Sequence, residues 1–109
     1  VRAKNFDTFC PIGPAIVTAD SLDFDNGLRI RTWLNKELRQ EDTTASMLFT
    51  IDELVAHLSK SNTLLPGTVI LTGTPAGTGK QQDPPTYLKS GDSITIEIDG
   101  IGVLNNTVC

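Results

Sequence analysis

Alternating apolar and polar side chains predict two β-hairpins. Residues 28–34 put Leu, Ile, Thr and Leu on one face and Arg, Arg and Trp on the other, and residues 93–99 place three isoleucines opposite polar side chains. A period of two is typical of a strand with one buried face. Asn35-Lys36 and Asp99-Gly100 supply turns, so partner strands are predicted over residues 37–40 and 101–108.

A helical period follows a capping signal. Thr50 precedes Glu53 by three residues, which is the spacing of a capping box. The apolar residues after Thr50 then share one helical face, namely Ile51, Leu54, Val55 and Leu58. The pattern predicts a helix over residues 51–60.

The remaining segments predict loops and short strands. Residues 1–14 have no period and contain two prolines and a glycine near their end, which predicts a shaped loop. The apolar runs 15–18 and 68–71 are interpreted as short strands. The second strand leads directly into the loop TGTPAGTGK and would determine its direction. Many strands with one helix predict a mainly β, α+β fold over a single domain, residues 1–109.

Composition narrows the function classes. The chain has 109 residues, 39% of them hydrophobic and 20% charged, with a formal net charge of −4. These values predict a soluble globular protein, and the scattered cations exclude nucleic acid and anionic membrane as partners. The apolar runs are far too short to span a bilayer, and an intracellular location is predicted. Cys10 and Cys109 are interpreted as free thiols, with one disulfide as the alternative.

Two segments contain candidate chemistry. Lys4, Asp7 and Thr8 offer a cation, a carboxylate and a hydroxyl to an anionic ligand, although an ordinary surface lysine is the other interpretation. Residues 69–79 contain three glycines and three threonines, a composition that lets backbone amides approach an anion. This loop is not a nucleotide-binding P-loop, because its glycine spacing is one residue too long and Gln81 replaces the hydroxyl residue.

A single histidine limits the other possibilities. His57 falls beside the apolar stripe of the predicted helix, and no second histidine exists to complete a zinc site. A serine nucleophile would need an oriented base, and His57 has no evident serine partner. His57 is therefore interpreted as a solvent-exposed residue without a catalytic role.

Four motifs together resemble the fumarylacetoacetate hydrolase family. They are AKNFDTFCPIGP at residues 3–14, NKELRQ at 35–40, VILTGTPAGTG at 69–79 and YLKSGDSITIEIDGIGVLNNTV at 87–108. The resemblance covers nearly the whole chain, with the motifs in the family's order. It implies a mixed β-roll, of which this chain would form only a part, and a homodimer in the full-length protein.

The family's chemistry implies the activity. Its members are hydrolases, lyases and isomerases of small 2-oxo and β-diketo acids, including acylpyruvates, fumarylacetoacetate, oxaloacetate and hydroxymuconate-type diacids. A divalent cation, Mg²⁺ with Mn²⁺ or Ca²⁺ as alternatives, stabilises an enolate beside the 2-oxo acid. The resemblance therefore implies a metal-dependent enzyme that breaks or forms C–C bonds or moves a proton.

The resemblance assigns roles to four residues. Lys4 matches the family's catalytic and substrate-binding lysine, and Gly73 with Thr74 matches the loop that holds a substrate carboxylate. Thr8 matches a position associated with the metal. The family's metal-binding carboxylates and its His-Glu pair precede the lysine motif, where this chain has only three residues.

Those missing groups define what is expected of this chain. We expect it to be the C-terminal part of one catalytic domain, and we expect metal binding only together with upstream carboxylates. The alternative is a truncated, non-catalytic remnant or pseudoenzyme that lacks the metal carboxylates. Isomerisation or decarboxylation of hydroxymuconate-type diacids is the alternative reaction.

Overall fold

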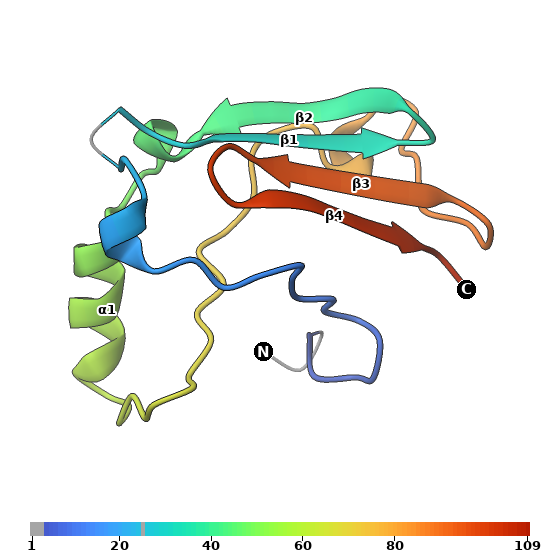
Figure 1. The fold of residues 1–109 in the computed structure, drawn as a ribbon. Helices are drawn as coiled ribbons and strands as arrows, with labels where there is room; N and C mark the ends of the chain where they lie inside the picture. The colour runs from blue at the N-terminus through green and yellow to red at the C-terminus, as the bar shows by residue number, and fades with distance from the viewer. Residues whose placement is uncertain (1–3, 25) are drawn as a thin grey trace.

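A single antiparallel sheet dominates the fold. The computed structural model describes residues 4–24 and 26–109, so residues 1–3 of the predicted N-terminal loop lie outside it. The sheet has the strand order β2-β1-β3-β4, and Figure 1 shows it above helix α1 (Ile51–Ser59) and the N-terminal segment. Its members are β1 (Arg29–Leu34), β2 (Glu37–Thr43), β3 (Ser93–Ile98) and β4 (Gly102–Thr107). Both predicted hairpins are confirmed, as is the mainly β fold class.

The first hairpin turns through two residues in the left-handed region. Asn35 has φ 50° and Lys36 has φ 72°. Two consecutive positive φ values give the turn a twist that matches that of the flanking strands. The Asn35 side chain also fixes the neighbouring turn, because its Nδ2 donates to Asp92 Oδ1 over 2.8 Å and its Oδ1 accepts from the Ser93 amide over 2.9 Å.

A β-bulge interrupts the pairing of β1 with β2. Thr32 is paired with Gln40, whereas the next residue of β1, Trp33, is paired with Leu38. Arg39 is therefore the extra residue of β2. A bulge bends its strand and changes the direction of the neighbouring side chains, and Gln40 is one of these neighbours.

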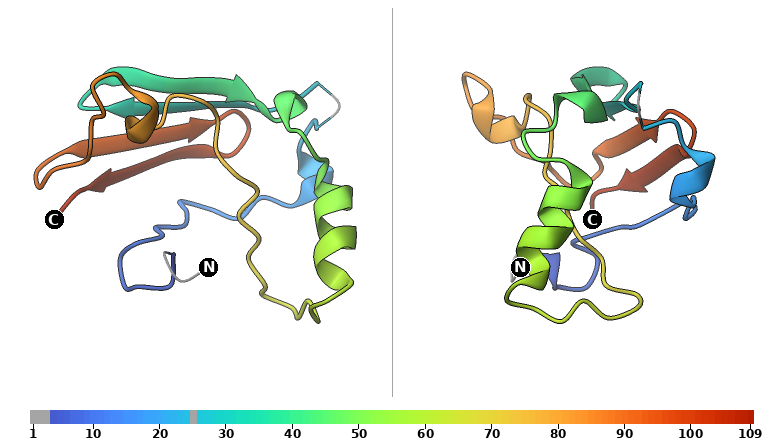
Figure 2. Two further views of the ribbon diagram at one scale, coloured as in Figure 1. Left: turned by 180° about the vertical axis from the view of Figure 1, so that it is seen from behind. Right: turned by 90° about the vertical axis from the view of Figure 1, so that its left-hand side faces the viewer.

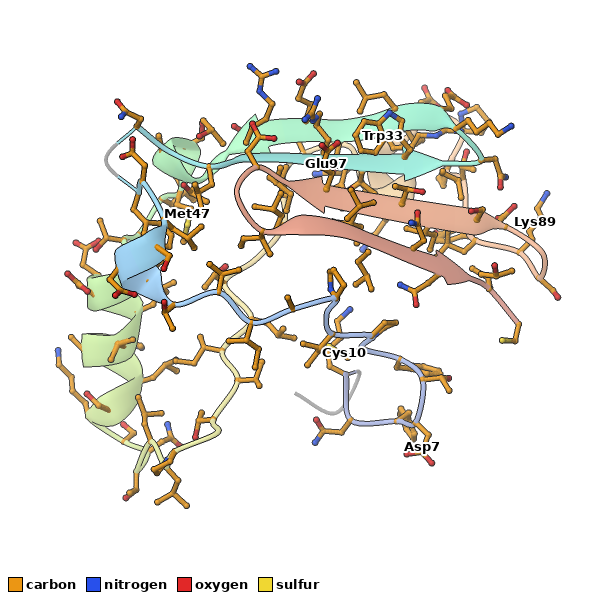
Figure 3. The ribbon with its side chains drawn as sticks, viewed as in Figure 1. Asp7, Cys10, Trp33, Met47, Lys89 and Glu97 are labelled. Carbon is orange, nitrogen blue, oxygen red and sulfur yellow. The ribbon has the colours of Figure 1, made fainter. Side chains whose placement is uncertain are left out.

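The central strands pair residues that are distant in sequence. Ile30, Thr32 and Leu34 face the three isoleucines of β3 in register. On the opposite face, the Arg31 guanidinium lies 3.2 Å from Glu97 and 3.1 Å from Asp99. Arg31 also lies 5.6 Å from the centre of the Trp33 ring, and Figure 3 shows Trp33 and Glu97 on this face. The side chains of β1 from Ile30 to Leu34 are thus half-buried on both faces of the sheet.

Helix α1 (Ile51–Ser59) begins at the predicted cap. The Glu53 amide donates to Thr50 Oγ1 over 3.2 Å, and the Thr50 amide donates to Glu53 Oε2 over 2.8 Å. Because two otherwise unpaired amide groups are satisfied, the helix start is fixed. The helix lies beyond one end of the sheet (Figures 1 and 2).

Two predicted strands are wrong. Residues 15–18 and 68–71 belong to no strand in the described part of the chain, and several of their apolar side chains are exposed, with Ile16 at 94% and Val69 at 62%. A strand exists only when a neighbour satisfies its backbone groups, and these runs have no such neighbour here. The remaining regular elements are short 3-10 turns, η2 (Ala19–Ser21), η3 (Thr44–Ser46) and η4 (Gly79–Gln81).

The described residues bury very little apolar surface. Leu28 is the one buried hydrophobic side chain among them, whereas Leu48 is 94% and Phe49 61% exposed. The Cα radius of gyration is 15.1 Å, against about 13 Å for a compact domain of this length. These features fit the predicted incomplete β-roll.

Two smaller predictions can also be compared with the structure. Cys10 and Cys109 are both free thiols, as predicted. In residues 4–24 and 26–109, no helix has the length and apolar character needed to cross a bilayer.

Candidate functional site

The loop of residues 72–79 lies against the edge strand β2. A Cβ atom on Gly77 would collide with the Arg39 carbonyl oxygen, and Gly77 has φ 98°. Only glycine accommodates both the positive φ and this close approach. The bulged residue of β2 therefore determines where the loop passes.

Gln40 joins β2 to the first half of this loop. Its Nε2 donates to Thr74 Oγ1 over 3.0 Å and to the Pro75 carbonyl oxygen over 2.8 Å. Sequence reasoning assigned Gln40 no role, although it closes the NKELRQ motif. The missed signal was an amide side chain on a strand in which four of the other residues are charged.

Gln81 organises the second half of the loop. Its Oε1 accepts hydrogen bonds from the Gly77 amide over 2.9 Å, the Thr78 amide over 2.9 Å and the Thr78 hydroxyl over 3.0 Å. These two amides are consumed within the protein. From Gly77 onward, the hydrogen bonds of the loop thus stabilise its own conformation and leave these two amides unable to bind a ligand.

The first half of the loop has free donors. Within the described part of the chain, neither the Gly73 amide nor the Thr74 amide takes part in a hydrogen bond. Both residues are exposed, and Gly73 has φ 116° with open space where a Cβ would lie. Two free amides beside a hydroxyl can bind a carboxylate through charge-assisted hydrogen bonds.

A cleft of about 410 Å³ opens beside these donors. Apolar side chains make up much of its wall, and Figure 3 shows Met47 where β2 leads toward α1. The cleft is lined by Ile30, Asp42, Thr43, Thr44, Ser46, Met47, Leu48, Phe49, Leu54 and residues 72–76. A small organic acid fits such a volume.

Asp42 supplies the carboxylate of this cleft. A hydrogen bond from the Ser46 side chain, and then one from the Thr43 amide over 2.8 Å, lower the pKa of Asp42 below its usual value. Asp42 therefore stays ionised near neutral pH and cannot serve there as a general acid. A ligand carboxylate is expected to face Gly73 and Thr74 and to avoid this wall.

The N-terminal loop occupies a different part of the molecule. Lys4 is exposed and forms no hydrogen bond or ion pair with other described residues. Thr8 has φ 68°, a value rare for a β-branched residue and typical of constrained functional loops. Figures 1 and 2 show this loop below the sheet, and Figure 3 places Asp7 at its outer end.

The predicted site residues therefore fall into two groups. Gly73 and Thr74 line the cleft, whereas Lys4 and Thr8 are not among its lining residues. A second, shallow hollow is lined by Asn5, Phe6, Asp7 and Phe9. The roles of Lys4, Thr8, Gly73 and Thr74 stay predictions.

The described residues do not fit a magnesium site by themselves. Magnesium prefers octahedral oxygen coordination that includes carboxylates. Among residues 4–24 and 26–109, no group of three or more His, Cys, Asp and Glu side chains is arranged to hold a metal ion. Coordination of magnesium here would need carboxylates in addition to those of the described residues.

Comparison with known proteins identifies the family. The profile of the fumarylacetoacetate (FAA) hydrolase C-terminal family matches residues 1–109. The mitochondrial oxaloacetate tautomerase FAHD2B of Bos taurus is 48% identical over 105 residues, which cover 96% of this chain and 33% of that protein. This chain thus spans about a third of the length of that relative.

Solved structures of family members are similar to this chain in fold. The fumarylacetoacetate hydrolase of Exiguobacterium antarcticum superposes with a TM-score of 0.91 and 46% identity, covering 98% of this chain and 38% of that one. A maleylpyruvate hydrolase from Sphingobium sp. SYK-6, in complex with manganese(II) and pyruvate, has a TM-score of 0.82 and 40% identity, covering 94% and 36%. Several different enzyme activities thus occur among the relatives. The chain belongs to the fumarylacetoacetate hydrolase family.

Proposed function

We propose that this chain supplies the carboxylate-binding part of an enzyme that acts on small 2-oxo acids through an enolate. The observation that carries the proposal is the pair of free amides at Gly73 and Thr74, beside a hydroxyl held by Gln40. Hydrogen bonds from amide and hydroxyl donors to a carboxylate are shorter and stronger than neutral ones. Such donors orient a 2-oxo acid without taking part in the reaction.

Keto-enol tautomerisation of oxaloacetate is the favoured reaction. It is supported by the 48% identity to a protein named an oxaloacetate tautomerase. In this reaction the enol oxygen loses a proton as the carbonyl forms, and the carbon next to the carbonyl carbon gains a proton. The resemblance of the N-terminal loop to the family's lysine motif supports a further proposal, that the Lys4 ammonium, although outside the cleft lining in this structure, stabilises the negative charge that develops on the 2-oxo oxygen.

Hydrolysis of a C–C bond is the second candidate. It is supported by the likeness to a maleylpyruvate hydrolase at 40% identity. Acylpyruvates and fumarylacetoacetate share the 2-oxo acid group, so Gly73 and Thr74 would bind them in the same way. Isomerisation or decarboxylation of a hydroxymuconate-type diacid would also use Gly73 and Thr74 to bind a carboxylate of the substrate.

A divalent cation belongs to the proposal for the whole protein. The maleylpyruvate hydrolase structure contains manganese(II) together with pyruvate, which supports Mg²⁺ or Mn²⁺ as the cofactor. Its carboxylate ligands would come from outside this chain, with Thr8 as a neighbouring residue. When bound, such a cation stabilises negative charge on the substrate oxygens.

A non-catalytic role is the alternative from a different class. It is supported by the lack of a metal-binding cluster among the described residues. A protein of this kind would bind a 2-oxo acid without turning it over. Finding the metal carboxylates in the full-length protein would exclude it.

Two further properties are proposed for the full-length protein. The word mitochondrial in the bovine relative's name supports a location inside the cell, in mitochondria or cytoplasm. We also propose a homodimer, which would share the extensive apolar surface described above. Sedimentation of the full-length protein would distinguish a dimer from a monomer.

The test is a substrate comparison with the full-length protein and Mg²⁺ or Mn²⁺. Ketonisation of enol-oxaloacetate is followed beside hydrolysis of maleylpyruvate, and a faster enzymatic rate on the first supports tautomerisation. Turnover of maleylpyruvate alone would replace it by hydrolysis. Turnover of neither substrate, combined with oxalate binding, would favour the non-catalytic alternative.

Replacement of Thr74 tests the carboxylate grip. Thr74→Val removes the hydroxyl at nearly constant size, and KM is expected to rise roughly tenfold, because a hydrogen bond to a charged group is lost. The turnover number should change less, since this contact is made equally in ground and transition states. Thr74→Ser keeps the hydroxyl and is the matched control. An unchanged KM in Thr74→Val would contradict the assignment.

A further inference from the structure

We propose that Gln40 is a positioning residue that forces the Thr74 hydroxyl to donate its proton to the bound carboxylate. This inference rests on the proposed function, because it assumes that Thr74 meets a 2-oxo acid. Gln40 lies outside the loop, and its hydrogen bond to Thr74 leaves the Thr74 hydroxyl as a donor toward the ligand. Gln40 itself touches no substrate in this assignment.

The Pro75 carbonyl determines the orientation of the Gln40 amide. The Gln40 nitrogen lies 2.8 Å from the Pro75 oxygen. A carbonyl oxygen only accepts hydrogen bonds, so the group that faces it must be the NH₂ end of the amide. The reverse orientation would bring two acceptors together.

The oriented amide in turn determines the role of Thr74. The same NH₂ group lies 3.0 Å from Thr74 Oγ1. An amide nitrogen donates and does not accept, so the hydroxyl oxygen must be the acceptor here. The hydroxyl proton is then directed elsewhere, and no described residue accepts it. An anionic ligand beside Gly73 and Thr74 is the acceptor that fits this free proton.

The bulge in β2 explains how a strand residue reaches the loop. Arg39 is the unpaired residue of the bulge, and Gln40 follows it directly. Gln40 is itself paired with Thr32 of β1, so the donor stands on a rigid element while Thr74 lies in irregular chain. A group fixed in this way holds its partner in one orientation without further reorganisation.

A double-mutant cycle in the full-length protein separates positioning from simple attachment. Gln40→Met keeps the size of the side chain and removes its donor, and it should raise KM for the 2-oxo acid roughly fivefold, with a smaller change in turnover. In the Thr74→Val background, the same substitution should change KM by less than about twofold, because no hydroxyl remains to be oriented. Equal factors in both backgrounds would overturn the positioning role.

Gln82→Met is the matched control. Gln82 is half-buried beside the same loop, and its side chain forms no hydrogen bond within the described residues. This variant should keep the wild-type KM. A rise equal to that of Gln40→Met would mean that any change near the loop disturbs it, which would overturn the proposal.

A second variant guards against misfolding of Gln40→Met. Gln40→Glu keeps the shape but lacks a proton to donate when ionised. Its KM relative to that of wild type should fall part of the way back as the pH is lowered through the carboxyl range, because a protonated carboxyl has one proton to donate in place of the two of the Gln40 amide. A constant ratio would overturn the proposal.

The outcomes also separate this inference from the proposed function. A wild-type protein that neither turns over 2-oxo acids nor binds oxalate would overturn both. An active wild-type protein whose Gln40 and Thr74 effects are independent would overturn the positioning role alone. Activity together with strong non-additivity would support both.

Discussion

At the scale of single residues, the site depends on which hydrogen-bond donors are already used. Gln81 occupies the amides of Gly77 and Thr78, so the ligand-binding capacity of the loop is concentrated at Gly73 and Thr74. The composition of the loop had predicted amides close to an anion. It could not show which of them remain free, because that depends on a side chain several residues away.

Gly77 gives a prediction at this scale. Gly77→Ala should destabilise the full-length protein by about 2 to 4 kcal/mol, because the new Cβ meets the Arg39 carbonyl and the residue keeps a positive φ. Gly91→Ala is the control, since Gly91 has φ 90° but open space around it. It should cost only about 1 kcal/mol. Urea unfolding of both variants measures the difference, and equal losses would show that the collision has no effect.

At the scale of elements, local patterns were sufficient where an element satisfies its own backbone. Helix α1 and both hairpins were predicted because their caps, turns and periods lie within a few residues. The runs 15–18 and 68–71 have the composition of strands, but strand formation depends on a neighbour that a local pattern does not contain. The contact between Gln40 and Thr74 spans 34 residues, which explains why sequence reasoning missed it.

The capping box of α1 predicts an acid-sensitive helix start. Hydrogen bonds from the Thr50 amide and then its hydroxyl lower the pKa of Glu53. A carboxyl with a lowered folded-state pKa stabilises the fold above its unfolded pKa, and this contribution is lost as the pH falls through the folded pKa. The full-length protein should therefore lose this stabilisation below about pH 4.5.

Glu53→Gln tests this effect. The variant should show a shallower fall in unfolding free energy over the acid range than wild type, measured by urea denaturation at several pH values. Asp52→Asn is the control, because Asp52 lies in the same first helical turn but takes no part in the capping box. A Glu53→Gln profile identical to that of wild type would refute the role of the cap.

At the scale of the whole molecule, exposed apolar side chains outnumber buried ones. Ile16, Leu48 and Phe49 are all more than half exposed, whereas Leu28 is the one buried apolar residue of the described chain. Isolated soluble domains rarely leave so many large apolar side chains exposed while burying so few. The fold class was predictable from the strand pattern, whereas the exposure of these side chains was not, because a local pattern does not contain the groups that pack against an apolar residue.

This surface predicts the behaviour of the 109-residue chain by itself. It should bind the dye ANS strongly and associate at micromolar concentrations, because apolar faces and the open edge of β4 are accessible. The full-length protein should bind little dye under the same conditions. Fluorescence titration and light scattering measure both effects, and a monomeric chain with weak dye binding would contradict the expectation.

The bulge at Arg39 links the ligand loop to the stability of the sheet edge. The loop of residues 72–79 covers β2 at the point where pairing is interrupted, through Gly77 beneath the Arg39 carbonyl and Gln40 on Thr74. A ligand that stabilises the contact of this loop with β2 must, by thermodynamic linkage, also stabilise the state in which β2 is paired with β1 and covered by the loop. Occupancy of the carboxylate site would therefore be recorded as slower amide hydrogen exchange in β2, including residues such as Leu38 that do not line the cleft.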